Sequence, residues 1–257
     1  ETGIRRYRCR ECGRRFTVIT NTIFDIRKLQ VSEWVCFLLD PFGYSSFSLT
    51  SKVNRNAVST TKYWVRKLFL LLVGVQDGIL LGGKVWVDET FIKVRKGDVE
   101  KRPDGKEYRG LSRNQMCIGI ACDRENAVFV FEGYGKTSKK KTLDAFSSHI
   151  KEGSHLIHDK EEGHSALVSK LGLTEEAYDS RKLKGIPDND NPLDRVNELC
   201  NLLQQFLSSH SGFNRDDIQD YLNLFSVMVN PPHNKYEKVK KILELGLEKP
   251  VLARFRD

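Results

Sequence analysis

The series of short apolar segments between residues 84 and 159 constrains the fold of this chain more than any other feature. Lys84-Val-Trp-Val-Asp88 alternates between apolar and polar side chains, as a strand with one buried face does. Asp123-Arg-Glu-Asn126 consists of turn formers that would join two neighbouring strands as a hairpin. We expect strands at 84–88, 117–122, 127–131 and 154–159, and a helix at about 142–150. This order indicates an α/β domain.

Amphipathic patterns predict helices after this region, at about 194–208, 215–229 and 236–245. Residues 93–114 are polar and rich in turn formers, so a loop or flexible hairpin is expected there. Residues 160–192 have no clear pattern.

The N-terminal part is expected to be helical over residues 31–76. The first helix should cover 31–39 with Ser32 as its N-cap. Residues 48–67 resemble a helix-turn-helix, with a turn near Asn54–Ala57 and a second helix from about Ser59. A glycine-bearing linker follows at 74–83. We therefore divide the chain into segments 1–30, 31–76, 84–230 and 231–257.

The charge distribution favours a nucleic-acid partner. The net charge is +8 and the isoelectric point about 9.1. No acidic residue occurs from Pro41 to Gln76, which suits a surface laid against phosphates; the alternative is a solvated basic face. The candidate DNA-binding residues are Arg14, Arg15, Lys52, Arg55, Lys62, Arg66 and Lys67.

The sequence predicts no membrane partner, because no segment approaches the roughly 20 apolar residues of a transmembrane helix. No signal peptide is recognised, and the six cysteines lack the even spacing of a disulfide framework. We therefore expect a cytoplasmic protein. Residue 1 is Glu, which suggests that the chain begins inside a longer reading frame.

Cys9 and Cys12 are separated by two residues and are followed by Gly13, as in one knuckle of a zinc ribbon. A complete Zn²⁺ site needs four ligands, and no matching pair lies nearby. The second half could have preceded residue 1; a decayed site and a free thiol pair are the alternatives.

Asp88 and Asp159 each close a predicted apolar strand. If these strands are neighbours, the two carboxylates converge and repel each other, and a divalent cation relieves the repulsion. Mg²⁺ or Mn²⁺ bound there, with a third ligand from a later helix, would support two-metal phosphoryl transfer. The alternative is that either residue is a helix cap or turn residue. No phosphate-binding loop, serine nucleophile elbow or dinucleotide fingerprint is present.

Three sequence segments carry a resemblance to a known family: Val85–Phe91, His158-Asp159, and Arg195–Leu207 followed by Tyr221–Phe225. They resemble bacterial insertion-sequence transposases of the ISXO2-like type, which have an N-terminal zinc ribbon. The resemblance implies an RNase H-like catalytic domain, a mixed sheet flanked by helices, behind a small zinc-knuckle and helix-turn-helix region.

The resemblance also implies a catalytic, metal-binding triad of Asp88, Asp159 and Asn197. Glu198 is the rival for the third position. The family usually has a lysine seven residues after the third member, where this chain has Gln204.

The implied activity is cleavage of phosphodiesters at transposon ends and joining of the freed 3′-hydroxyl to target DNA. The implied partners are terminal inverted repeats, target DNA and further copies of the chain, with nucleoid association. Two alternatives remain open: an RNase H-like nuclease or junction resolvase, and a non-catalytic or decayed DNA-binding relic.

Overall fold

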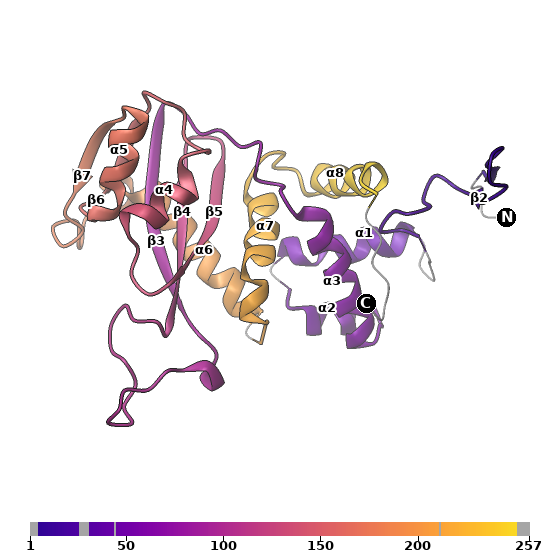
Figure 1. Cartoon of the computed structure of the whole chain (residues 1–257), viewed down its shortest axis with the longest axis horizontal. Coiled ribbons are helices and arrows are strands. Elements are labelled where there is room, and N and C mark those ends of the chain that lie inside the picture. Colours follow the sequence, from indigo (N-terminus) through magenta and orange to yellow (C-terminus); the bar gives the residue numbers. More distant parts are fainter. Residues whose placement is uncertain (1–4, 26–30, 44, 211, 251–257) are drawn as a thin grey trace. The chain divides into compact units, whose positions relative to one another are not determined.

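The computed structural model describes residues 5–25, 31–43, 45–210 and 212–250. The chain divides into two compact units, one formed by residues 1–73 and 232–257 and the other by residues 74–231 (Figure 1). The ends of the expected segments 1–30 and 231–257 lie partly outside the described residues.

The first unit is mainly helical. Its elements are β1 (Tyr7–Arg8), β2 (Arg15–Phe16), α1 (Val31–Leu39), η1 (Pro41–Gly43), α2 (Phe47–Val53), α3 (Val58–Leu72) and α8 (Lys235–Glu248). An aromatic cluster forms its core: Trp34 stacks on Trp64, and Phe37 meets both rings edge-on. These three side chains are almost fully buried, so α1 and α3 are held together mainly by apolar packing.

The expected turn between α2 and α3 is present. Ser46 caps α2 by accepting a hydrogen bond from the Leu49 backbone N–H. The chain then reverses through Asn54 and Arg55, whose φ of 53° is left-handed, before α3 begins. The expected cap of the first helix was wrong: α1 begins at Val31, so Ser32 lies inside its first turn.

The C-terminal helix α8 belongs to the first unit. A Cβ atom added at Gly246 would lie 2.8 Å from the Phe24 ring and 3.1 Å from Ile23. Only glycine permits so close an approach of α8 to this buried pair. After α8 ends, Lys249 Nζ donates hydrogen bonds of 3.1 Å to the carbonyls of Leu71 and Val73 at the end of α3.

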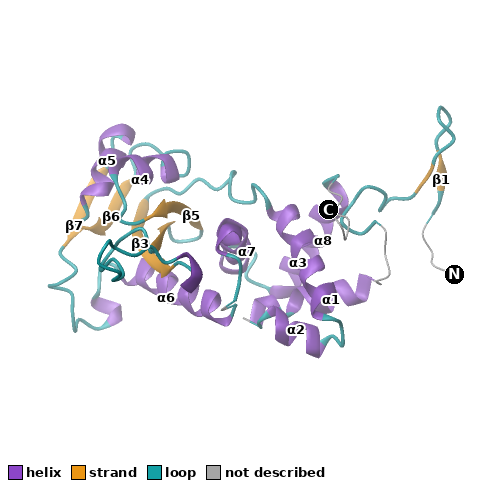
Figure 2. Ribbon diagram, turned by 60° about the horizontal axis from the view of Figure 1, so that its bottom comes forward, coloured by secondary structure: helices purple, strands orange, loops and turns teal. Residues whose placement is uncertain are grey.

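The second unit is a five-stranded mixed sheet flanked by helices (Figures 1 and 2). Its strands are β3 (Lys84–Lys93), β4 (Gln115–Cys122), β5 (Ala127–Tyr134), β6 (His155–Asp159) and β7 (Thr174–Tyr178), in the order β5-β4-β3-β6-β7. β3, β4 and β5 are antiparallel neighbours, whereas β6 and β7 run parallel to β3. This is the RNase H-like mixed sheet that the sequence led us to expect.

The helices of this unit are α4 (Lys139–Phe146), α5 (Ser165–Leu171), α6 (Asp194–Ser209) and α7 (Ile218–Val229); short 3-10 turns are η2 (Lys96–Asp98), η3 (Glu162–His164), η4 (Asp188–Asp190) and η5 (Arg215–Asp217). On one face of the sheet, Val85 and Val87 of β3 pack against Phe146 of α4 and Leu167 of α5. On the other face, Trp86 donates a hydrogen bond to the carbonyl of Pro192, directly before α6.

Amide side chains cover the outer edge of β5. The Gln76 amide donates a hydrogen bond to the Phe129 carbonyl and accepts one from the Phe129 backbone N–H. The Asn230 amide does the same with the backbone of Ala127. These bonds satisfy edge groups that would otherwise be open to another strand. Gln76 in the linker and Asn230 at the end of α7 therefore close this edge of the sheet.

Several expected boundaries shift. α4 begins at Lys139, not near 142, because the Ser138 hydroxyl caps it by accepting from the Lys141 backbone N–H. β3 continues to Lys93, so Asp88 lies within the strand and does not close it. The region without a clear pattern contains α5 and β7. Within the described residues, no helix combines the length and apolar character required to cross a membrane.

Candidate active site

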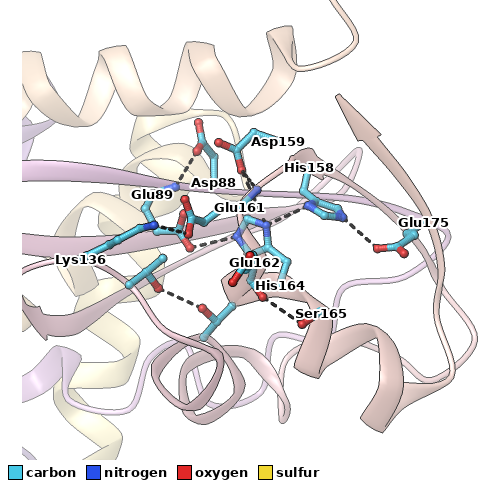
Figure 3. Close-up of polar contacts among 12 residues, drawn as sticks. Asp88, Glu89, Lys136, His158, Asp159, Glu161, Glu162, His164, Ser165 and Glu175 are labelled. Atoms are coloured by element: carbon cyan, nitrogen blue, oxygen red, sulfur yellow. Dashed lines mark hydrogen bonds and ion pairs between the residues drawn. The ribbon is translucent and has the colours of Figure 1, made fainter. Parts of the chain in front are cut away.

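Asp88 and Asp159 lie next to each other across two parallel strands. The register pairs Val87 of β3 with His158 of β6, and the two aspartates are the following residue on each strand. Residues in register on neighbouring strands point to the same face, so both aspartate side chains leave the sheet on the face opposite Val87 and His158. Asp159 is the last residue of β6, and its Oδ1 also lies 3.9 Å from His164 Nδ1. Figure 3 shows the two side chains side by side.

Burial dominates the electrostatics of both aspartates. It raises the pKa of Asp88 from its ordinary value of 3.8 to about 7; the Glu89 backbone N–H opposes this rise, and the negative charge of Asp159 adds to it. Burial likewise raises the pKa of Asp159, against a hydrogen bond of 3.1 Å from the Glu161 backbone N–H. Among the described residues, no lysine or arginine forms an ion pair with either carboxylate. Two neighbouring carboxylates without a basic partner favour a bound cation.

Helix α6 covers the same face of β3. Gln204 Nε2 donates a hydrogen bond of 2.7 Å to Thr90 Oγ1, two residues beyond Asp88 on the strand. Asn197 precedes Gln204 by seven residues, close to two helical turns, and so lies on the same side of α6. Asn197 is half-buried, whereas Glu198 is exposed and 3.7 Å from Arg195. This placement favours Asn197 over Glu198 as the side chain nearest the sheet.

A chain of polar contacts on the opposite face was not predicted. His164 Nε2 lies 3.0 Å from Glu89 Oε1, and His164 Nδ1 lies 2.9 Å from His158 Nδ1. His158 Nε2 lies 3.2 Å from Glu175 Oε2 (Figure 3). No local pattern could link Glu89 to His164, because they are 75 residues apart.

The two histidines differ in their protonation. Burial disfavours the cation of His164, but the hydrogen bond and charge of Glu89 outweigh burial and raise the pKa of His164. Burial and the neighbouring His164 lower the pKa of His158, against the hydrogen bond that its Nε2 makes to Glu175. A proton shared by this pair therefore resides mainly on His164.

A further carboxylate, the half-buried Glu132 of β5, lies on the same face as Glu89. Burial raises its pKa to about 7, although the Thr137 hydroxyl donates a hydrogen bond to it. Its Oε1 atom has no hydrogen-bond partner among the described residues. A Cβ atom added at Gly119 would lie 2.5 Å from that oxygen, so the glycine makes room for the carboxylate.

Lys136 is the basic residue linked to Asp159 through Glu161. Lys136 Nζ lies 3.0 Å from Glu161, whose backbone N–H donates to Asp159. Lys141 Nζ instead donates to the carbonyls of Tyr134 and Lys136, at 2.8 and 3.0 Å. Lys141 therefore closes the β5–α4 connection.

Cys9 and Cys12 lie at the turn of the β1–β2 hairpin. The Cys9 backbone N–H donates a hydrogen bond to the Arg14 carbonyl, and the Cys9 carbonyl accepts one from the Gly13 backbone N–H. Gly13 has a left-handed φ of 70°. Backbone N–H groups of Cys12 and then Glu11 lower the pKa of the Cys9 thiol. This favours the thiolate that Zn²⁺ requires. In the described part of the chain, no third ligand joins these two thiols.

Most candidate DNA-binding residues are exposed. Lys52, Arg55, Lys62 and Arg66 lie on α2, α3 and the turn between them, and Arg14 and Arg15 lie on the hairpin. Lys67 does not fit the expected role. It is 3% exposed, and its ammonium group donates to the Ile23 carbonyl inside the first unit. Burial lowers its pKa, which the charge of Asp25 opposes.

No protein-family model and no curated protein matches the chain. Solved structures similar to it include the Mos1 strand transfer complex (13% identity, TM-score 0.35) and the Mos1 mariner paired-end complex with Mn (11% identity, TM-score 0.36). Each match covers 88% of this chain and 78% of the other. A chain of the simian T-cell lymphotropic virus intasome, in complex with PP2A regulatory subunit B56 gamma, is 12% identical with a TM-score of 0.35. That match covers 58% of this chain and 49% of the other.

Proposed function

We propose that this chain is a metal-dependent DNA transposase of an insertion sequence, with Asp88, Asp159 and Asn197 as active-site residues. The observation that carries the proposal is the in-register position of Asp88 and Asp159 on one face of parallel strands. Helix α6 lies over the same face, which supports Asn197 as the third member.

The residues present fit Mg²⁺ or Mn²⁺. Two carboxylates and one amide oxygen are hard oxygen donors of the kind these ions prefer. Burial without a lysine or arginine partner makes ionised Asp88 unfavourable, and a divalent cation would remove that penalty. Asp88 and Asp159 would hold two ions between them, and Asn197 one of them. Bound ions would activate the attacking oxygen and stabilise the leaving oxygen.

The chain's own residues would orient and hold this site. Asp88 is held by the Glu89 backbone N–H and Asp159 by that of Glu161, so neither carboxylate rotates freely. The Gln204–Thr90 bond would keep Asn197 over the strands. In the reaction, water would attack a phosphorus at the transposon end and release a 3′-hydroxyl. That hydroxyl would then attack a target phosphodiester, and one bond would form for each bond broken.

The first unit would bind DNA. Its exposed cations, Lys52, Arg55, Lys62 and Arg66 with Arg14 and Arg15 of the hairpin, are suited to phosphate contacts that position DNA. A Zn²⁺ ion held in part by Cys9 and Cys12 would stiffen the hairpin. Copies of the chain would assemble on DNA to pair two ends.

Labelled inverted-repeat DNA and an unlabelled target, incubated with the chain and Mg²⁺ or Mn²⁺, test the proposal. Wild type should yield nicked ends and strand-joined products, and Asp159→Ala should abolish both. Asp144→Ala changes an exposed aspartate on α4 and is the matched control; it should retain wild-type activity.

Two outcomes would replace the proposal. Cleavage without joined product indicates a nuclease or junction resolvase. Binding of the repeats without cleavage, unchanged by Asp88→Asn, indicates a non-catalytic DNA-binding relic.

A further inference from the structure

The contacts of His158 and His164 leave their two Nδ1 atoms facing each other. Each histidine presents Nε2 to a carboxylate, Glu175 for His158 and Glu89 for His164. An ionised carboxylate only accepts hydrogen bonds. Both Nε2 atoms therefore carry a proton, and in the neutral tautomers both Nδ1 atoms carry lone pairs.

Two lone pairs at this separation repel each other. The Nδ1 atoms are 2.9 Å apart, and His164 Nδ1 is 3.9 Å from Asp159 Oδ1. A positive species is needed at this point, either an extra proton on one ring or a metal ion bound by both. The surroundings of the pair resemble those of ligating histidines, which commonly donate their second ring N–H to a carboxylate.

We propose that His158, His164 and Asp159 bind a divalent transition-metal ion of the zinc class through the two Nδ1 atoms and the Asp159 carboxylate. The three ligand atoms lie within 4.8 Å of one another. At Zn–N distances of 2.0–2.1 Å, tetrahedral ligation places two nitrogens about 3.3 Å apart. The pair needs to open by only a few tenths of an ångström. Imidazole ligands favour such an ion over Mg²⁺.

The burial of the site suits a held ion. His164 is fully buried and His158 is 3% exposed, whereas the Asp159 side chain is 28% exposed. An ion would therefore enter from the Asp159 side, and a water molecule would be its fourth ligand. It would tie the end of β6 to η3 and fix one oxygen of Asp159. The other oxygen remains for an ion shared with Asp88, but this inference does not depend on the proposed function.

Metal binding by the full chain tests the inference. Cys9→Ser and Cys12→Ser are introduced together, so that thiolates at the hairpin do not contribute. Zn²⁺ titrated by calorimetry should bind with one equivalent, and Co²⁺ should give a visible d–d spectrum without thiolate charge-transfer bands. His158→Ala or His164→Ala in this background should abolish both signals. His155→Ala, on the same strand, should leave them unchanged, because the His155 ring makes its polar contacts with Thr174 and Glu176 and not with the histidine pair.

A second variant separates metal binding from misfolding. The Glu175 side chain is 48% exposed, so Glu175→Ala should leave the circular dichroism spectrum and the unfolding midpoint of the metal-free chain unchanged. Loss of the carboxylate behind a ligating histidine should weaken Zn²⁺ affinity about 10- to 100-fold, and Glu175→Gln should restore part of it. The inference is overturned if the double cysteine variant binds no Zn²⁺, or if His158→Ala or Glu175→Ala retains the parent affinity. Such a result would mean that the pair shares only a proton.

Discussion

Gln204 on α6 donates a hydrogen bond of 2.7 Å to Thr90 on β3, at the position where the resembled family usually has a lysine. Gln204 is also exposed, so a longer cation at this position can reach solvent. The amide thus binds the helix to the sheet and contributes no charge.

Gln204→Lys should therefore strengthen binding to inverted-repeat DNA. One added phosphate contact should steepen the slope of log K against log salt by about 0.9. Fluorescence anisotropy across a salt series measures the slope. Gln205→Lys, the exposed neighbour, is the control for added charge alone. Equal slopes in the two variants would contradict a phosphate contact specific to position 204.

The stability of the metal-free chain should fall as pH rises because of Asp88. Its pKa is 3.8 in the unfolded chain and about 7 when folded, so the folded chain binds more protons between these values. The contribution of Asp88 is therefore fully present below pH 3.8 and is lost as pH rises through about 7.

Asp88→Asn should remove this dependence. At pH 8 without metal the variant should be more stable than wild type by up to about 4 kcal/mol, since each pKa unit corresponds to about 1.4 kcal/mol. The difference should vanish near pH 4 and shrink when Mg²⁺ is added, because an ion that binds only the folded state stabilises wild type. Urea unfolding of both proteins at pH 8 and near pH 4 measures this difference in the free energy of unfolding. A difference independent of pH would show that Asp88 is not the titrating group.

Lys67 and Lys62 should behave oppositely, although both lie on α3. Lys67→Met leaves the Ile23 carbonyl without its donor, which should cost about 1–3 kcal/mol of stability. The variant should keep the wild-type salt slope for DNA binding at a temperature where it is folded. Lys62→Ala should keep wild-type stability and reduce the slope by about 0.9. If Lys67→Met reduced the slope as well, Lys67 would have to be accessible to DNA.

Gly246→Ala should destabilise the first unit. The added Cβ atom would press on the buried Phe24 ring at 2.8 Å, and overpacking of this kind costs about 1–3 kcal/mol. The better helix propensity of alanine offsets at most about 1 kcal/mol. Gly97→Ala is the control, because nothing lies within 4 Å of its added Cβ. Thermal unfolding should show a lower midpoint only for Gly246→Ala; equal midpoints would mean that Phe24 yields without cost.

The local patterns were sufficient for most elements of the fold. Short apolar segments predicted β3, β4, β5 and β6, with apolar–polar alternation in β3, and the helical period predicted α6, because each pattern reflects burial within one element. Because side chains alternate along a strand, Asp88 and Glu89 point to opposite faces. The end of β3 and the presence of α5 and β7 were not predicted: β7 is mostly exposed, so it lacks the apolar alternation of a half-buried strand.

Tertiary structure decided which distant residues meet. The pairing of Val87 with His158 brings Asp88 beside Asp159, and a shift of one residue would turn β6 over. The contact of His164 with Glu89 and the burial of Lys67 depend on how separate elements pack. The sequence by itself determined the elements and their buried sides, since these depend on neighbours along the chain. Only the fold decided the partners of His164, Lys67 and Gly246, because those partners are set by strand register and side-chain packing between segments.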